Sequence, residues 1–197
     1  DDVFRITVEL KHDQHWGYSI YYAGKRLVIK IKRQPADLQI EKMKIAVDAV
    51  HGGSNAGAIG ILSKIQEKKY TLLIAKELEK ELSENGAAVY MTRDKDTGLG
   101  MLERVEMVKK ADPDFLISIH LNSSAKDSIR GVSTYYRYIG FRPLTKYIQE
   151  SMLELGLVDF GNIGSFNFTL NGPTDYPNCL VEVAFLSNKE DEILILN

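Results

Sequence analysis

The hydrophobic positions in the first part of the chain repeat every second residue, as they do in β-strands. Residues 3–10 and 18–22 alternate in this way or are rich in β-branched and aromatic side chains, and a similar run at residues 27–32 follows a short glycine turn. We expect a hairpin here, preceded by one more strand. Three strands alone bury too little apolar surface to be stable, so we expect this arm to pack on other structure, with residues 33–43 as a linker.

The pattern changes at Lys44, where short apolar runs begin to alternate with segments that carry apolar residues at helical spacing. We predict strands over residues 44–50, 87–92, 115–119, 131–138 and 180–185, and helices over residues 68–83 and 101–110, from Pro143, and from the capping-box spacing of Ser187 to Glu190. This alternation predicts an α/β fold with a single mixed or mostly parallel sheet flanked by helices. We therefore divide the chain into a β-rich arm with its linker, residues 1–43, and a larger domain, residues 44–197.

Composition and charge exclude several classes of function. The chain is 44% hydrophobic and 26% charged, as in ordinary globular proteins, and contains no run of the roughly 20 apolar residues that cross a bilayer. A formal charge of -2 provides no basic field for nucleic acid. Cys179 is the only cysteine, so an internal disulfide and a thiolate zinc cluster are both excluded, and we expect it to be buried as a small apolar residue. The chain starts at Asp1 without a leader sequence, so we expect any targeting signal to lie outside it.

Two histidines follow predicted strands directly. His51 comes after the strand at residues 44–50 and opens a glycine-rich loop, while His120 ends the strand at residues 115–119. Ligands of open α/β sheets bind at the carboxyl ends of strands, and neutral imidazoles are common zinc ligands. Hydrogen bonding of each ring to the backbone explains the same positions, so on the residues alone both interpretations stay open.

Two glutamates stand where they could complete a metal site. Glu67 precedes the predicted helix at residues 68–83 and could supply a third zinc ligand, although a carboxylate at the positive end of a helix dipole is the simpler interpretation. Glu182 lies inside the apolar strand at residues 180–185, where burial of a charge costs several kcal/mol unless it is paired, bound to metal or neutralised. Since perturbed carboxylates concentrate in active sites, we predict a proton-transfer role for Glu182.

Seven short motifs occur in a fixed order along the second part of the chain. They are DAVHGG (48–53), GAIG (57–60), EK (67–68), TRD (92–94), LERV (102–105), SIHLN (118–122) and VEVAFLSN (181–188). In these motifs the chain resembles the zinc-dependent N-acetylmuramoyl-L-alanine amidases of bacterial cell-wall turnover. An ordered series of this length is far more specific than any single short motif.

The resemblance implies a zinc-hydrolase-like fold and a specific reaction. His51, Glu67 and His120 would be the ligands of one Zn²⁺ in the catalytic domain, and Glu182 would be the catalytic glutamate. The reaction would be hydrolysis of the amide bond between N-acetylmuramic acid and L-alanine of peptidoglycan, during cell-wall remodelling or daughter-cell separation. Family members act outside the cytoplasmic membrane, so the resemblance implies a periplasmic, wall-associated or secreted enzyme.

Two positions depart from the family pattern. Val50 replaces a glycine before the first histidine, where a positive φ would be unfavourable for valine. Residues 170–171 are Leu-Asn where many members have Leu-Arg, which puts a substrate contact in doubt. The connection at residues 139–142 has no room for the inhibitory helix that some relatives carry. A protein activator is therefore compatible with the resemblance but is not indicated by an inhibitory insertion.

Other polar and aromatic residues have simpler expected roles. We expect salt bridges from Arg93, Asp94 and Arg104, solvated loop positions for His12 and His15, and packing roles for Tyr135, Tyr136 and Tyr138 rather than sugar stacking.

Two rival functions remain beside the zinc amidase. A zinc exopeptidase acting on free peptides would share the α/β architecture, but the sequence shows no second ligand set for a two-metal site. A non-catalytic peptidoglycan-binding module would retain the fold without turnover. The replacement of the family glycine by Val50 suggests this alternative.

Overall fold

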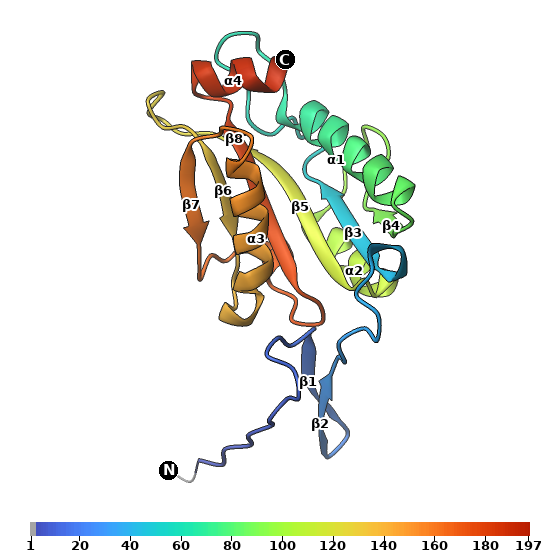
Figure 1. Ribbon diagram of the computed structural model, residues 1–197. Coiled ribbons are helices and arrows are strands. Elements are labelled where there is room, and N and C mark those ends of the chain that lie inside the picture. Colours follow the sequence, from blue (N-terminus) through green and yellow to red (C-terminus); the bar gives the residue numbers. More distant parts are fainter. Residues whose placement is uncertain (1–2) are drawn as a thin grey trace.

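A six-stranded mixed sheet forms the centre of the molecule in the computed structural model, which describes residues 3–197 (Figure 1). Its strand order is β4-β3-β5-β8-β6-β7. The strands are β3 (Lys44–Ala49), β4 (Ala88–Met91), β5 (Phe115–Asn122), β6 (Val132–Tyr135), β7 (Asp159–Ile163) and β8 (Asn178–Phe185). Every pair is parallel except β6 with β8. The predicted α/β class with a mixed, mostly parallel sheet is confirmed.

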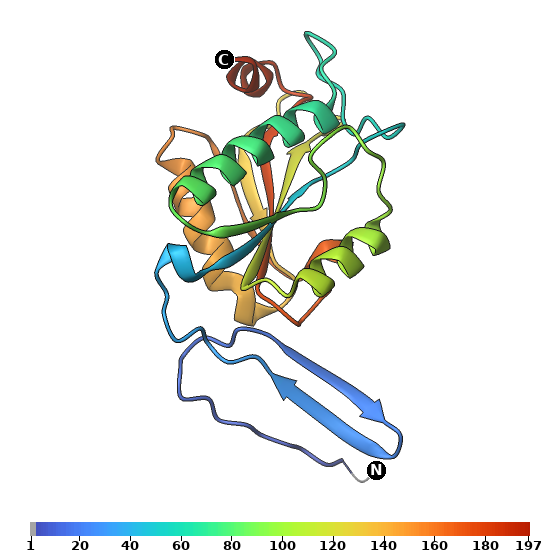
Figure 2. The same ribbon diagram turned by 90° about the vertical axis from the view of Figure 1, so that its right-hand side faces the viewer.

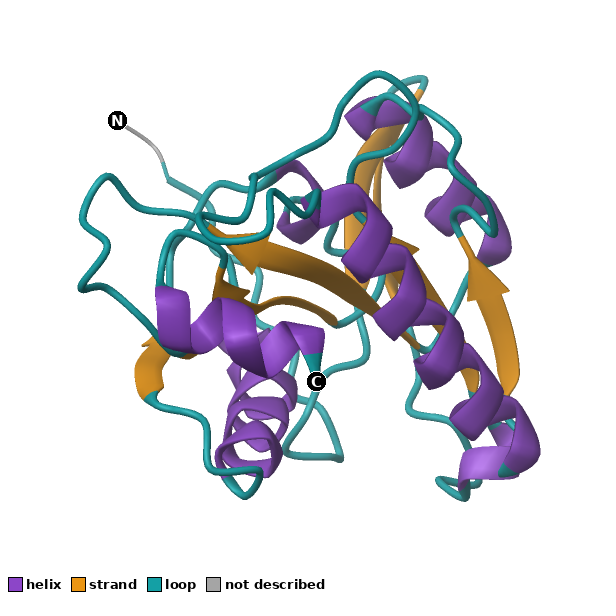
Figure 3. Ribbon diagram, turned by 90° about the horizontal axis from the view of Figure 1, so that it is seen from above, coloured by secondary structure: helices purple, strands orange, loops and turns teal. Residues whose placement is uncertain are grey.

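Helices flank this sheet, as the view from above shows (Figure 3). They are α1 (Glu67–Glu84), α2 (Met101–Ala111), α3 (Arg142–Leu153) and α4 (Lys189–Leu196), with short 3₁₀ turns at Ile40–Lys42, Ile139–Phe141 and Thr169–Asn171. Alternate residues of β3 serve the two faces: Ile45 and Val47 pack in the cluster of Ala75 from α1, whereas Ala46 packs with Val108 from α2. None of these helices, within residues 3–197, is long and apolar enough to cross a membrane.

A buried ion pair fixes α2 to the sheet. Arg104 Nη1 lies 2.7 Å from Asp48 Oδ1, and both side chains are fully inaccessible to solvent. The prediction of a salt bridge is therefore confirmed for Arg104, but it is wrong for Arg93 and Asp94, which form no ion pair within the described residues. Arg93 instead donates hydrogen bonds to backbone carbonyl groups, including those of Ala49 and Val50, because it faces the end of β3.

The arm contains one hairpin, formed by β1 (Tyr18–Ala23) and β2 (Arg26–Ile31). The predicted strand at residues 3–10 is wrong: this segment pairs with no strand, and its apolar side chains are exposed. Alternation makes a segment suited to a strand, but the strand itself requires a neighbouring edge, which residues 3–10 do not have in this structure. The boundary between arm and domain at residue 43 stays a prediction.

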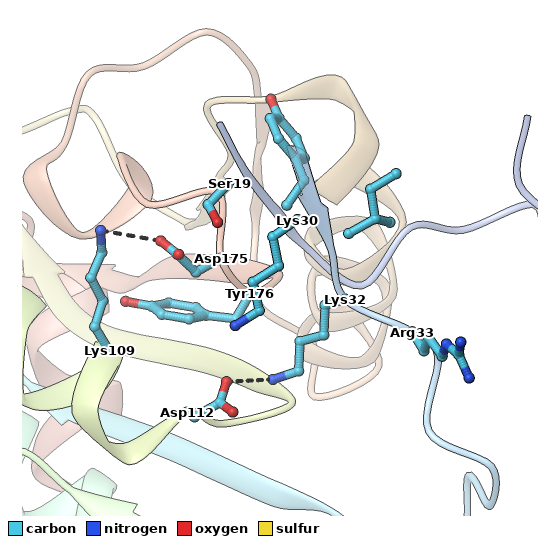
Figure 4. Close-up of a pocket in the computed structure, with 10 residues that line it drawn as sticks. Ser19, Lys30, Lys32, Arg33, Lys109, Asp112, Asp175 and Tyr176 are labelled. Atoms are coloured by element: carbon cyan, nitrogen blue, oxygen red, sulfur yellow. Dashed lines mark hydrogen bonds and ion pairs between the residues drawn. The ribbon is translucent and has the colours of Figure 1, made fainter. Parts of the chain in front are cut away.

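The hairpin docks where β3 begins, at the opposite end of the sheet from α4 (Figures 1 and 2). Tyr18 N donates to Thr174 O at 2.6 Å, and Thr174 Oγ1 donates to Tyr18 O at 2.7 Å. A cavity of about 460 Å³ lies at this junction. Lys32 and Asp112, two of the residues that line it, form an ion pair (Figure 4). The expectation that the arm packs on other structure is thus confirmed.

The two arm histidines differ in their surroundings. His12 is exposed, as expected, but the solvated position predicted for His15 is wrong. The His15 ring packs 4.9 Å from the Phe141 ring and 5.6 Å from the Tyr18 ring, between centroids. Burial lowers its pKa. His15 therefore belongs to the contact between arm and domain.

Candidate active site

The glycine-rich loop between β3 and α1 positions the first histidine. His51 itself has a φ of 60°, and Val50 is not among the residues with positive φ. The left-handed turn therefore falls one residue after the valine, and Val50 is packed in the core with 1% of its surface exposed. The departure from the family glycine thus carries no backbone strain at Val50.

Glu67 is the first residue of α1, and it faces the loop. Its Oε2 atom lies 3.1 Å from His51 Nε2, and its two oxygens accept hydrogen bonds from Ala58 N at 2.8 Å and Leu121 N at 3.0 Å. Burial acts to raise the pKa of Glu67, but the hydrogen bonds from His51, Ala58 N and Leu121 N outweigh it, and the pKa lies below its usual value. A Cβ atom at Gly57 would collide with both Glu67 and His51, so the loop must have glycine there.

His120 is held from behind by a chain of hydrogen bonds. Its Nε2 atom lies 3.1 Å from Ser118 Oγ, which donates its single proton to Asp48 Oδ2 at 2.7 Å. Ser118 can then only accept, so His120 has its proton on Nε2 and a lone pair on Nδ1. Burial lowers the pKa of His120 to about 4, which keeps the ring neutral.

Glu182 lies beside His120 in the register of β5 and β8. The residue is 8% exposed, and the Oε2 atom of its side chain has no hydrogen-bond partner among the described residues. Burial, with a smaller contribution from the Glu67 charge, raises the pKa of Glu182 to about 8. A buried carboxyl oxygen without a partner is costly, and this cost indicates a group kept for chemistry.

The four predicted site residues therefore meet at one place. His120 Nδ1 lies 3.8 Å from Glu67 Oε1 and 3.9 Å from Glu182 Oε1, and the centroids of the His51 and His120 rings are 6.3 Å apart. Within residues 3–197, no three His, Cys, Asp or Glu side chains stand at the spacing of a formed metal centre, and Glu67 is hydrogen-bonded to His51 directly. Two imidazoles and one carboxylate are nevertheless the donor set of a His₂Glu zinc centre. A cation beside the carboxylates would also compensate their charge, so the residues fit zinc.

Sequence reasoning missed the residues behind His120. Asp48 is a carboxylate within the apolar run of β3, which is the same signal that singled out Glu182, and Ser118 stands two residues before His120 on the same face of β5. Asn171, the position of a doubted substrate contact, is 1% exposed and donates to Tyr135 O and Asn178 Oδ1. It has a structural role in this protein.

Comparison with known proteins identifies the same region of the chain. The family described as N-acetylmuramoyl-L-alanine amidase matches residues 45–197. The germination-specific N-acetylmuramoyl-L-alanine amidase of Bacillus subtilis is 30% identical, over 82% of this chain and 75% of the relative. The probable cell wall amidase LytH of Staphylococcus saprophyticus is 31% identical, over 86% of this chain and 57% of the relative, so this chain spans little more than half of that protein.

Solved structures agree with the sequence relatives. The catalytic domain of CwlV, an N-acetylmuramoyl-L-alanine amidase from Bacillus (Paenibacillus) polymyxa var. colistinus, superposes with a TM-score of 0.75 at 30% identity, covering 79% of this chain and 87% of that one. The N-acetylmuramoyl-L-alanine amidase from Clostridium difficile 630 gives a TM-score of 0.75 at 29% identity, covering 79% and 86%.

Proposed function

This chain belongs to the N-acetylmuramoyl-L-alanine amidase family, and on that premise we propose that it hydrolyses the amide bond between N-acetylmuramic acid and L-alanine in peptidoglycan. The observation that carries this proposal is the meeting of two histidines and two glutamates, from four separate elements, at one end of the sheet. The reaction would serve remodelling of the cell wall or separation of daughter cells.

Zinc dependence is a general property of this family. We propose that His51, Glu67 and His120 hold one Zn²⁺, because these side chains converge and the His120 Nδ1 lone pair faces Glu67. When bound, the ion supplies polarisation of the scissile carbonyl and a lowered pKa of its water. The chain's own contribution is to hold the ligands in place: Ala58 N and Leu121 N orient Glu67, and Ser118 orients the His120 ring.

Glu182 would handle the protons of this reaction. In its ionised form Glu182 can accept a proton at Oε2 from the attacking water and later deliver it to the nitrogen of the leaving L-alanine. Position in the middle of β8, fixed by pairing with β5 and β6, keeps the carboxyl group in one place through both transfers.

The substrate determines where the protein acts. The relatives named cell wall amidases imply action outside the cytoplasm, where peptidoglycan lies. We propose a location in the periplasm, in the cell wall or in the secreted fraction.

The connection from β6 to α3 contains only residues 136–141, so the described chain carries no inhibitory helix at that point. Any control of the activity would have to come from elsewhere.

Zinc content and release of stem peptides from purified peptidoglycan test the proposal together. We expect the wild-type protein to contain zinc and to release peptides with a free L-alanine terminus. His51→Ala and His120→Ala should each lose the metal, whereas Glu182→Gln should retain it and lose at least about 100-fold in turnover. Bound zinc without peptide release would favour a binding module, and cleavage of free peptides alone would favour an exopeptidase.

A further inference from the structure

Three aromatic rings form a continuous surface beside His120, which we name the aromatic wall: Tyr135, Phe166 and Phe168. The Phe166 and Phe168 rings are stacked, with centroids 4.9 Å apart and planes at 29°. Tyr135 lies edge-on to both, at 5.2 Å and 5.3 Å. Phe168 in turn lies 6.3 Å from the His120 ring. The wall therefore reaches the place where the scissile bond would lie.

Exposure rises along the wall from its base to its tip. Tyr135, on β6, is 5% exposed and fixes the base, whereas Phe166 is 46% exposed. A phenylalanine placed only for stability would be expected to bury most of its ring, since burial of a large apolar side chain is worth about 1.5–3 kcal/mol. Phe166 forgoes much of this gain and keeps nearly half of its surface exposed, stacked on Phe168, which lies next to His120.

The backbone before Phe166 is bent to hold it there. Ser165 has a φ of 61°, a left-handed conformation that non-glycine residues rarely adopt. Such strain costs on the order of 1–3 kcal/mol and is concentrated at functional sites and ligand clamps. An exposed ring on a strained turn, stacked on a second ring that leads to His120, is therefore a built surface rather than a chance exposure.

The substrate offers one group that matches a flat apolar surface. This step rests on the proposed function: the scissile amide has a sugar on one side and a short peptide beginning with alanine on the other. A pyranose ring presents a broad face of C–H groups, which aromatic side chains bind by apolar contact while its hydroxyl groups stay in water. We infer that the aromatic wall is a subsite for a sugar ring on the glycan side of the scissile bond, with Phe166 as its outer contact.

Substitution at Phe166 tests this subsite with two substrates that share the same amide. One is an N-acetylmuramoyl peptide, and the other is the corresponding lactyl peptide, which lacks the sugar ring. Phe166→Ala should raise KM for the sugar-bearing substrate about 3- to 10-fold, as expected for the loss of one aromatic contact, with kcat within about twofold. KM for the lactyl peptide should not change, and Phe166→Tyr, which keeps the ring, should behave like wild type.

Phe160→Ala is the matched control. Phe160 is 42% exposed, close to the value for Phe166, but its ring contacts Phe185 rather than the aromatic wall. It should leave KM for both substrates unchanged, and zinc content should be equal in all variants.

A binding measurement separates failure of the subsite from failure of the proposed reaction. Saturation-transfer NMR with a disaccharide of N-acetylglucosamine and N-acetylmuramic acid, without a stem peptide, reports sugar contact in the absence of turnover. We expect transfer to the sugar ring protons in wild type and a marked loss in Phe166→Ala. If neither peptide substrate is cleaved by wild type, the amidase proposal fails while this measurement still decides the subsite. An equal loss on both substrates, or no loss on either, would overturn the inference.

Discussion

Removing the hydroxyl group of Ser118, which lies behind His120, should weaken metal binding although no proposed ligand is replaced. Ser118 Oγ lies 3.1 Å from His120 Nε2 and 2.7 Å from Asp48 Oδ2, so Ser118→Ala deletes the partner of the ring and one hydrogen bond to a buried carboxylate. A hydrogen bond to a charged group contributes about 1.5–3 kcal/mol, and loss of a partner behind a metal-binding histidine costs about 10- to 100-fold in metal affinity. We therefore expect both a destabilised fold and a weaker zinc site.

A control variant separates these two effects. Thr92 Oγ1 also donates to Asp48, at 2.7 Å, but it is not hydrogen-bonded to His120. Thr92→Val should thus cost a similar free energy of unfolding and leave the affinity for zinc unchanged. Urea unfolding gives the first quantity, and competition for zinc with a chromophoric chelator gives the second. Equal zinc affinity in Ser118→Ala and wild type would refute the proposal that Ser118 orients the ring.

Three further predictions concern the loop, the last helix and the arm. Gly57→Ala should abolish zinc binding, because its Cβ atom would push His51 and Glu67 apart and its φ of 70° disfavours alanine; unchanged zinc content would contradict this. Burial acts to raise the pKa of Glu192, but the hydrogen bonds that it accepts from Leu62 N and Ser63 N outweigh burial and hold the pKa below the usual 4.5. The contribution of Glu192 to stability is therefore present above pH 4.5 and lost as pH falls through the lowered pKa. The free energy of unfolding should then decrease less steeply with falling pH in Glu192→Gln than in wild type. Lys32→Ala removes a half-exposed ion pair with Asp112 that is worth about 0.2–1 kcal/mol. Because this pair joins the arm to the domain, limited proteolysis should cut the linker at residues 33–43 faster in this variant. Zinc content should not change.

Most of the sheet was predictable because its buried strands carry long apolar runs. The histidines could be placed as well, since the carboxyl ends of parallel strands meet at one edge whatever the details of packing. β7 was not predicted: Asp159–Ile163 has two polar and one glycine residue in five, and it pairs only because β6 offers an edge. Residues 3–10 show the opposite case, a strand-like pattern without an edge to pair with.

The interior of the candidate site was less predictable than the four residues proposed for metal binding and catalysis. His51, Glu67, His120 and Glu182 stand at positions that a sequence motif can mark. The contact of Ser118 with Asp48 depends on the register of β5 against β3, which places these two residues opposite each other. The aromatic wall depends on a turn conformation at Ser165, and nothing in the local sequence predicts a positive φ there.

The hold of α4 on the glycine-rich loop also has a consequence for folding. Glu192 lies 130 residues after Leu62 in the chain, yet it fixes the loop that connects His51 to Glu67. Until α4 has folded onto the domain, this loop would lack the hydrogen bonds that Leu62 N and Ser63 N donate to Glu192. The placement of His51 relative to Glu67 therefore depends on a helix more than a hundred residues further along the chain, so the candidate site is complete only when the whole domain has folded.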